Sequence, residues 1–424
     1  MKKYPTLLSL YLAQSIPMSF FSTIVPVIMR QEKYSLAMIG LLQLIKLPWI
    51  FKFLWAPLVD RSCENSVRKY KQWIIGSEFV YAALIIGIGF LNLQFNFTLI
   101  VTLMVIAFIA SGTQDIATDA FAIHILKKDE RSLGNSMQSA GSFLGTMAGS
   151  GVLLILYHYF GWQGLMFCLA GFVLLALIPL YYYKYKKNQE EKDYSLPAET
   201  VQVETLSLKH TRMKPASMKD IGLFFRQKGI FRRLILLFFF YSGIIGILSL
   251  MKPFLVDNGF TVKQIGIISG ICGTASGALS ALLGGHLIKK IGRRKSLYIF
   301  ASFSLLVTIY FVWLLSGHMT HMQLYTAVVL LWISYGMSSV GIYTISMDIV
   351  RKGREGTDFT IQIVITHLSS LLITIGSGKL ADIIGYRGLF ITESIAALLL
   401  LIALPFLYRE QLNQRTDDTK RIIE

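Results

Sequence analysis

The chain has 424 residues, of which 54% are hydrophobic and only 15% are charged. This composition excludes an ordinary soluble protein and indicates a polytopic membrane protein of the all-α class. The net charge of +17 would suit nucleic acid only if the basic residues were clustered, and the three cysteines lack the spacing of a metal site or a disulfide framework.

Twelve apolar segments follow one another along the chain, and each is long enough to cross a bilayer as an α-helix. They lie near 6–29, 35–58, 72–92, 98–123, 134–158, 163–183, 231–254, 262–288, 296–316, 322–349, 358–381 and 389–408. The first follows two lysines, as a signal peptide would, but its apolar part continues through two prolines without a cleavage site. We therefore expect it to be retained as the first of twelve transmembrane helices.

The basic residues lie at alternate helix ends. With the N-terminus placed in the cytoplasm, 33 of the 41 Lys and Arg residues fall in inner segments and six fall in outer ones. The positive-inside rule then predicts that both chain ends are cytoplasmic. Because the basic residues are spread over seven inner segments, the sequence favours the lipid bilayer as a partner and excludes nucleic acid.

The second segment, SLAMIGLLQLIKLPWIFKFLWAPLVDR (35–61), carries charge inside an apolar run. A lysine at the bilayer centre costs about 2.5 to 3.5 kcal/mol unless it is paired or hydrated, so we expect Lys46 and Lys52 to face protein or water. The segment ends on Asp60 and Arg61, which cannot enter the hydrocarbon. It therefore indicates a functional helix rather than an anchor.

The fourth segment holds Asp115 and Asp119, four residues apart and hence on one helix face. Two buried carboxylates on one face repel when both are ionised, so at least one should bind a proton readily. Lys52 lies at a comparable depth, and we hypothesise that it pairs with one of them and that protonation or substrate exchanges this pair. The alternative is a permanent ion pair that stabilises the first helix bundle. Lys46 is the better candidate to bind an anionic group of a substrate.

A polar connection divides the chain into a first half (1–184), a linker (185–230), a second half (231–408) and a tail (409–424). Ser217 is expected to cap a short interfacial helix in the linker. The halves repeat: SLAMIG (35–40) recurs as TVKQIG (261–266), and GSGVLLILYHYFGWQGLMF (149–167) recurs as GSGKLADIIGYRGLF (376–390). A parallel repeat predicts two six-helix bundles with a substrate site between them.

The loop after the eighth segment, GHLIKKIGRRKSL (285–297), resembles the loop signature of the major facilitator superfamily, and Asp60 and Arg61 keep its acidic part in the first half. The resemblance implies gating loops that hold the bundles together at the cytoplasmic side and release them when the bundles rock. The alternative is that these charges only set topology. In the second half the candidate gating residues are Gly285, Lys290, Gly292, Arg293 and Arg294.

KFLWAPLVDR (52–61), GTQDIATDAF (112–121) and KPFLVDNGFTVKQIG (252–266) resemble the AmpG-like branch of this superfamily, the muropeptide permeases and acetyl-coenzyme A transporters. The stretch at 25–49 also resembles the siderophore permeases close to this branch. The resemblance implies a monomeric importer of the bacterial inner membrane, driven by protons or another cation and without a cofactor or metal. We expect no enzyme, since the chain lacks metalloprotease, P-loop and nucleophile-elbow motifs. A transport-inactive sensor is the remaining alternative.

Helices one, four, seven and ten line the cavity in proteins of this fold, and here they offer hydroxyls, amides and rings suited to sugar or peptide groups. The candidates are Tyr11, Gln14, Gln114, Tyr241, Ser242, Tyr335, Ser338, Ser339 and Tyr343, with Lys252 at the outer mouth. Lys252 could instead snorkel to the interface. Small-residue stripes on the fifth and eighth segments predict close helix contact, and Asp348, near a helix end, is expected to be hydrated.

Overall fold

The computed structural model describes residues 3–21, 25–31, 43–63, 66–92, 95–184, 215–317 and 319–408. Eight helices among these residues are long and apolar enough to cross a membrane. The repeat motif at 35–40, most of the linker (185–214) and the tail (409–424) lie outside the described residues.

The first half consists of helices that run back and forth across one bundle. They are α1 (Lys3–Ser19), α2 (Val25–Gln31), η2 (Gln43–Lys46), α4 (Leu47–Phe51), η3 (Lys52–Leu54), α5 (Ala56–Cys63), α6 (Val67–Gly89), α7 (Phe97–Ile125), α8 (Arg131–Met147), η4 (Ala148–Val152), α9 (Leu153–Leu175) and α10 (Ile178–Tyr181). The described part of the second predicted span is not one regular helix, because two short 3-10 helices, η2 and η3, flank α4. Pro48 and Pro57 are the first-turn prolines that suit such breaks.

The linker and the second half contribute a second set of helices. They are α12 (Lys219–Phe225), α13 (Ile230–Phe239), α14 (Ser242–Asp257), α15 (Val262–Ile265), η5 (Gly266–Gly273), α16 (Thr274–Ile291), α17 (Arg293–Leu314), α18 (His321–Met347) and α19 (Glu355–Leu407). The elements η4 and η5 are π-helical stretches within the fifth and eighth predicted spans.

Two glycines turn the chain at matching places of the repeat. Gly161 lies inside α9 with φ 63°, and Gly385 lies inside α19 with φ 68°. A positive φ is strained for residues with a Cβ, so glycine is the residue that fits both turns. They separate the fifth span from the sixth and the eleventh from the twelfth, and they are equivalent residues in FGWQG (160–164) and IGYRG (384–388). Equivalent turns at equivalent glycines support the internal repeat.

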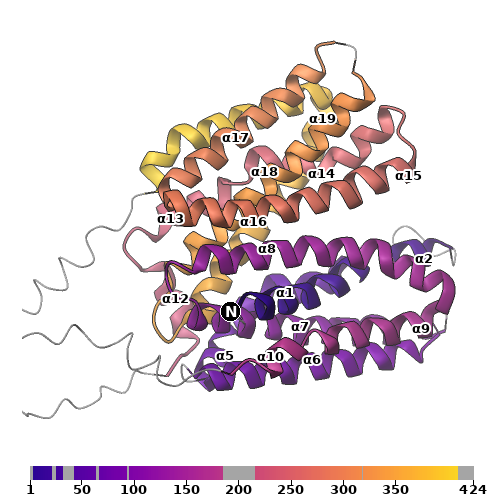
Figure 1. Cartoon of the computed structure of the whole chain (residues 1–424), viewed down its shortest axis with the longest axis vertical. Helices are drawn as coiled ribbons and strands as arrows, with labels where there is room; N and C mark the ends of the chain where they lie inside the picture. Colours follow the sequence, from indigo (N-terminus) through magenta and orange to yellow (C-terminus); the bar gives the residue numbers. More distant parts are fainter. Residues whose placement is uncertain are drawn as a thin grey trace, which may run out of the picture.

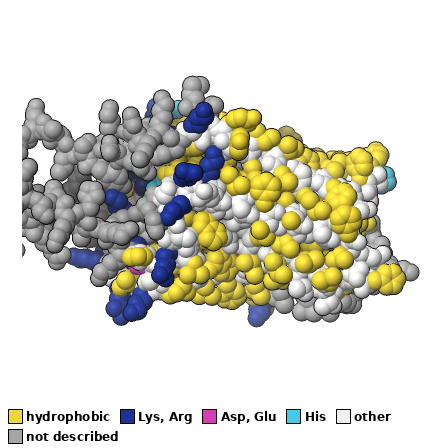
Figure 2. All heavy atoms as spheres, turned by 90° about the horizontal axis from the view of Figure 1, so that it is seen from below, with side chains coloured by type: hydrophobic (Ala, Val, Ile, Leu, Met, Phe, Trp, Pro, Cys, Tyr) yellow, Lys and Arg dark blue, Asp and Glu magenta, His cyan; other side chains and the backbone are white. Residues whose placement is uncertain are grey.

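The two halves form two adjacent bundles, with α8 of the first half beside α16 of the second (Figure 1). Their approach is close at Gly285 on α16, where an added Cβ would lie 2.6 Å from the Ser132 carbonyl oxygen on α8. The N-terminus and α12 lie at the same end of the molecule. Figure 2 shows that Lys and Arg side chains gather at this end, which we call the basic end, while apolar side chains cover much of the remaining visible surface.

The predicted small-residue stripe on the fifth span packs within the first half. A Cβ added at Gly141 would lie 2.9 Å from the Leu8 carbonyl oxygen, and one added at Gly145 would lie 2.6 Å from the Ser15 Cβ, both on α1. The stripe predicted on the eighth span differs, since an added Cβ at Gly270 would meet nothing within 4 Å. Close helix contact therefore explains the first stripe and only part of the second.

Candidate functional site

Lys52 and Asp115 form an ion pair inside the first half. The Lys52 Nζ donates to the Asp115 Oδ2, and the two side chains are 1% and 6% exposed. The same ammonium lies 4.7 Å from the centre of the Trp49 ring. Burial of either charge alone would be costly, so the pair and the ring together explain how a lysine is accommodated in an apolar helix. Of the two partners predicted for Lys52, the geometry gives Asp115.

Asp119 lies one helical turn further along α7 and has neutral partners. It accepts a hydrogen bond from the Tyr11 hydroxyl at 2.8 Å and one from the Gln138 side-chain amide at 3.4 Å. Both acids are buried on one helix, yet one contacts a cation and the other contacts neutral donors. Two titratable groups whose surroundings differ in this way favour different protonation states.

Polar groups of the predicted lining surround these acids. The Gln14 amide donates to the Gln114 oxygen at 2.5 Å, and the Trp55 indole donates to the Thr113 hydroxyl at 3.1 Å. Among the described residues, the Gln138 Oε1 is buried without a hydrogen-bond partner. The Gln114 Nε2 and the Thr118 hydroxyl on α7 are likewise buried without a partner.

The second half contributes rings and hydroxyls. The Tyr241 and Tyr335 rings lie 5.6 Å apart, and Tyr335 also lies 5.6 Å from Phe143 of the first half. The Ser339 hydroxyl donates to Ser139 of the first half at 2.8 Å. Ser242 and Ser338 are buried, and Tyr343 packs against the apolar clusters of both halves. These predicted residues therefore lie at or near the boundary between the bundles.

The other two candidate lysines lie apart from the ion pair. Lys46 is half-buried at the end of η2, and the five residues between it and Lys52 form α4. Lys252 is exposed on α14, as a lysine that extends to the membrane interface would be.

Asp60 connects the halves at the basic end. Its carboxylate accepts hydrogen bonds from the backbone amides of Gly356 at 3.0 Å and Thr357 at 2.7 Å, and from the Thr357 hydroxyl at 2.6 Å. The Tyr70 hydroxyl donates to the same carboxylate at 2.8 Å. Asp60 of the first half thus provides an acceptor for the free amides at the start of α19, where a negative charge is also favoured by the helix dipole.

Asp348 makes a second contact between the halves. It accepts from Arg131 of the first half at 3.1 Å and from Arg293 of its own half, and Arg131 also donates to the Met347 carbonyl at 2.8 Å. The expectation that Asp348 is hydrated was therefore wrong, because its side chain is only 14% exposed. Asp348 directly follows α18 and lies between two arginines that begin α8 and α17.

Of the predicted gating-loop residues that the structure describes, only some make contacts or turns at the basic end. Arg293 binds Asp348, and Gly292 makes the turn between α16 and α17 with φ 86°. Arg61, Lys290 and Arg294 are exposed at the basic end.

The linker helix α12 docks beside these contacts. Asp220 binds Arg354 at 2.8 Å, and Arg351 donates to the Asp220 carbonyl at 2.8 Å. Burial alone would raise the pKa of Asp220, but Arg354, Arg351 and the Ser217 amide lower it below its usual range. The predicted Ser217 cap was wrong, because no side chain of the described residues caps the start of α12. The Ser217 backbone amide instead donates a hydrogen bond to the Asp220 carboxylate at 2.7 Å.

Several site residues escaped the sequence reasoning. Tyr70, Arg131, Gln138 and Thr357 are ordinary residue types outside any motif, and two of them, Arg131 and Thr357, bind partners 217 and 297 residues away. The crowding of Arg351, Arg354 and Asp358 beside a span was the one available signal, and Arg351 does bind Asp358 at 2.6 Å.

Comparison with known proteins agrees with this architecture. The sequence profile of the Major Facilitator Superfamily matches residues 7–374. The anhydromuropeptide permease of Escherichia coli K12 is 25% identical over 403 residues, which cover 94% of this chain and 78% of that protein. A putative transporter AmpG 4 of Rickettsia conorii is 22% identical over 93% of this chain and 94% of its own length.

Solved structures match the fold along almost the whole chain. A bacterial homologue of the iron transporter ferroportin, in an outward-facing state, has a TM-score of 0.66 and 13% identity over 96% of this chain and 99% of its own. The E. coli fucose:proton symporter FucP has a TM-score of 0.67 and 13% identity over 96% and 98%. At this identity the likeness shows the fold alone. The predicted resemblance and the predicted fold of twelve transmembrane helices in two bundles are confirmed.

Proposed function

The chain belongs to the Major Facilitator Superfamily, and on that premise we propose that it imports a bulky anionic solute, such as an anhydromuropeptide, by proton-driven alternating access. Members of this family are secondary transporters of small-molecule solutes, not enzymes, and this chain is a multi-pass membrane protein. What we propose beyond family membership is the substrate, the coupling ion and the orientation in the membrane.

The observation that supports proton coupling most directly is the different surroundings of Asp115 and Asp119. Lys52 neutralises Asp115, whereas Asp119 is buried against the Tyr11 hydroxyl and the Gln138 amide. A proton that binds either carboxylate removes a buried negative charge, and loss of that proton restores it. Protonation of Asp115 would release Lys52, and deprotonation of Asp119 would offer Lys52 a second partner. The ion pair can thus respond to the proton gradient.

The solute class follows from the groups around this pair. The boundary between the halves offers the hydroxyls of Ser338 and Ser339 and the rings of Tyr241 and Tyr335, which suit sugar and peptide groups. Lys46, which is half-buried, is the residue that we propose for an anionic group of the solute. The similarity to an anhydromuropeptide permease makes a muropeptide the first solute to test.

We propose that the basic end faces the cytoplasm, as the distribution of Lys and Arg favours. The Asp60 and Asp348 contacts both join the halves at this end, so the described conformation is one in which the cytoplasmic side is closed. Opening toward the cytoplasm then requires both contacts to break, and closure of the opposite side would accompany it.

The test of coupling uses proteoliposomes and radiolabelled anhydromuropeptide. Asp115→Asn and Asp119→Asn should each abolish the dependence of uptake on an imposed pH gradient, while the protein remains folded and reconstituted. Asp382→Asn, at an exposed carboxylate on α19, is the matched control and should keep that dependence. Full gradient-driven uptake in both buried-site variants would contradict the proposed coupling.

Substrate choice is tested in the same vesicles by competition. Unlabelled anhydromuropeptide should compete with the labelled solute, whereas ferric siderophores and nucleotide-type anions should not. Counterflow of labelled solute, measured without any gradient, distinguishes a transporter from a sensor that binds but does not move its ligand. Binding without counterflow would exclude the proposed import.

A further inference from the structure

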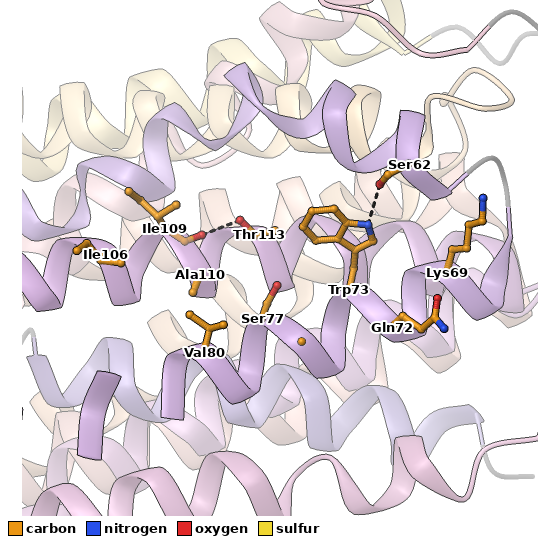
Figure 3. Close-up of a pocket in the computed structure, with 11 residues that line it drawn as sticks. Ser62, Lys69, Gln72, Trp73, Ser77, Val80, Ile106, Ile109, Ala110 and Thr113 are labelled. Atoms are coloured by element: carbon orange, nitrogen blue, oxygen red, sulfur yellow. Dashed lines mark hydrogen bonds between the residues drawn. The ribbon is translucent and has the colours of Figure 1, made fainter. Parts of the chain in front are cut away.

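A groove of about 660 Å³ lies on the first half, away from the boundary between the bundles. It is formed by Ser62 on α5, by residues 69–80 of α6 and by residues 106–113 of α7. Figure 3 shows these side chains arranged along α6 and α7. None of the acidic or basic residues assigned above to solute or proton binding lines it.

The groove is polar at one end and apolar at the other. Lys69, Gln72 and Ser62 lie at the end near the start of α6, where the Trp73 indole donates to the Ser62 hydroxyl at 2.7 Å. Val80 and Ile109 lie at the other end and are 51% and 43% exposed. Apolar side chains exposed on a membrane-spanning helix face acyl chains, so this end of the groove opens toward the bilayer.

The length of the groove matches one leaflet. Lys69 and Val80 are eleven residues apart on α6, which corresponds to about 16 Å of helix rise. The hydrocarbon core of a bilayer is about 30 Å thick, so the groove spans roughly half of it. Its polar end lies at the basic end of the molecule, and a tryptophan beside it is typical of the membrane interface.

We propose that this groove binds an anionic phospholipid, with the head group at Lys69 and an acyl chain along Val80, Ile106 and Ile109. Lys69 is the one charged residue among the side chains that line the groove. A lysine close to the membrane surface attracts an anionic head group with about 1 kcal/mol. A water-soluble ligand would have no apolar group to pack against the apolar end of the groove, whereas a lipid has its acyl chain.

The bound lipid would contact α6, the helix whose Tyr70 donates a hydrogen bond to Asp60. Tyr70, which donates to Asp60, follows Lys69 directly on α6. The proposal requires only that the chain crosses a membrane, and the orientation proposed above makes the leaflet cytoplasmic. Failure of proton-driven muropeptide uptake would therefore leave the lipid site untouched.

Two substitutions test the two ends of the groove. Lys69→Gln removes the charge at the polar end. Its matched control is Lys295→Gln, because Lys295 is the third residue of α17 as Lys69 is of α6. Gly76→Leu fills the groove, since an added Cβ at Gly76 meets no atom within 4 Å. Its control is Gly171→Leu on α9, where an added Cβ also meets nothing within 4 Å.

The measurement is native mass spectrometry of the full chain, delipidated and then titrated with phosphatidylglycerol or phosphatidylcholine. The wild-type chain and both controls should carry the first phosphatidylglycerol several-fold more readily than phosphatidylcholine. Lys69→Gln should lose most of that preference, and Gly76→Leu should reduce the first adduct of both lipids. Wild-type binding in both groove variants, or an equal loss of preference in Lys295→Gln, would overturn the proposal.

Discussion

The fourth and tenth spans, α7 and α18, occupy matching places in the two repeats but differ in chemistry. Buried on α7 are two carboxylates, Asp115 and Asp119, whereas α18 has no Asp, Glu, Lys or Arg anywhere between its first and last residues. In their place α18 presents buried hydroxyls such as Ser338 and Ser339. The repeat thus preserves the backbone while, of these two spans, α7 alone carries buried carboxylates, and this difference agrees with the coupling role proposed above for the first half.

The basic end shows a different relation between the halves. Carboxylates of both halves make contacts there: Asp60 accepts from the start of α19, Asp348 accepts from Arg131, and Glu355 lies 3.7 Å from His124. The first contact uses backbone amides and a helix dipole, and the second uses guanidinium groups. The two contacts hold the same end together by different kinds of interaction, so salt should affect them differently.

The largest effect expected from the contrast between the halves follows loss of the buried lysine. Lys52→Met leaves the Asp115 carboxylate without its cation, and breaking a buried ion pair typically costs about 3 to 5 kcal/mol. We expect a large fall in the thermal unfolding temperature, measured by tryptophan fluorescence, and a loss of solute uptake. Lys379→Met, at an exposed lysine of α19, should leave both unchanged.

The double variant Lys52→Met/Asp115→Asn separates stability from transport. It removes both charges, so most of the lost stability should return while uptake remains absent. A single Lys52→Met variant as stable as the wild-type chain would show that the contrast in charge between the halves has no energetic basis.

The next effect concerns the two small-residue stripes. Gly145→Ala places a Cβ 2.6 Å from Ser15 on α1, and overpacking of this kind costs about 1 to 3 kcal/mol. Gly270→Ala enters open space and should not lower stability. Thermal unfolding of the two variants in one detergent checks this, and an equal loss in both would contradict the difference in packing.

A smaller effect is expected when the two contacts at the basic end are broken separately. Asp60→Ala leaves the Gly356 and Thr357 amides without their acceptor, and loss of such a cap costs about 0.5 to 2 kcal/mol. Hydrogen exchange at the start of α19 should therefore rise several-fold. Asp348→Ala should instead raise exchange at the start of α8, beside Arg131.

Salt sharpens the same comparison. The Debye length falls from about 30 Å at 0.01 M to about 3 Å at 1 M ionic strength, which weakens contacts between partly exposed charges. High salt should raise exchange beside the Asp348 contact in the wild-type chain more than beside the Asp60 contact. The opposite order would mean that the two contacts do not differ in the way their donors suggest.

Patterns within short stretches of sequence predicted the helices and the repeat, whereas contacts between distant segments depend on how the helices pack. Apolar run length predicted the spans, and the turns found at Gly161 and Gly385 fall at equivalent residues of the predicted repeat. Depth along the helices predicted that Lys52 meets an acid on α7 but not that Asp115 is the partner. The sequence could not place Gly356 or Thr357 against Asp60, because 296 and 297 residues separate Asp60 from these partners on α19.

The smallest effect expected lies in the linker, which neither half repeats. Because the folded-state pKa of Asp220 is lowered, its contribution to docking of α12 is present above the unfolded value of about 3.9 and is lost as pH falls below it. Hydrogen exchange in α12, corrected for intrinsic rates, should stay level from pH 8 to 5 and rise only below about pH 4. Asp220→Asn should raise it modestly at every pH in that upper range, since Arg354 then loses a charged partner. Exchange that is unchanged in this variant would mean that the apolar contact of Phe224 with Ile361 alone holds α12 against the second half.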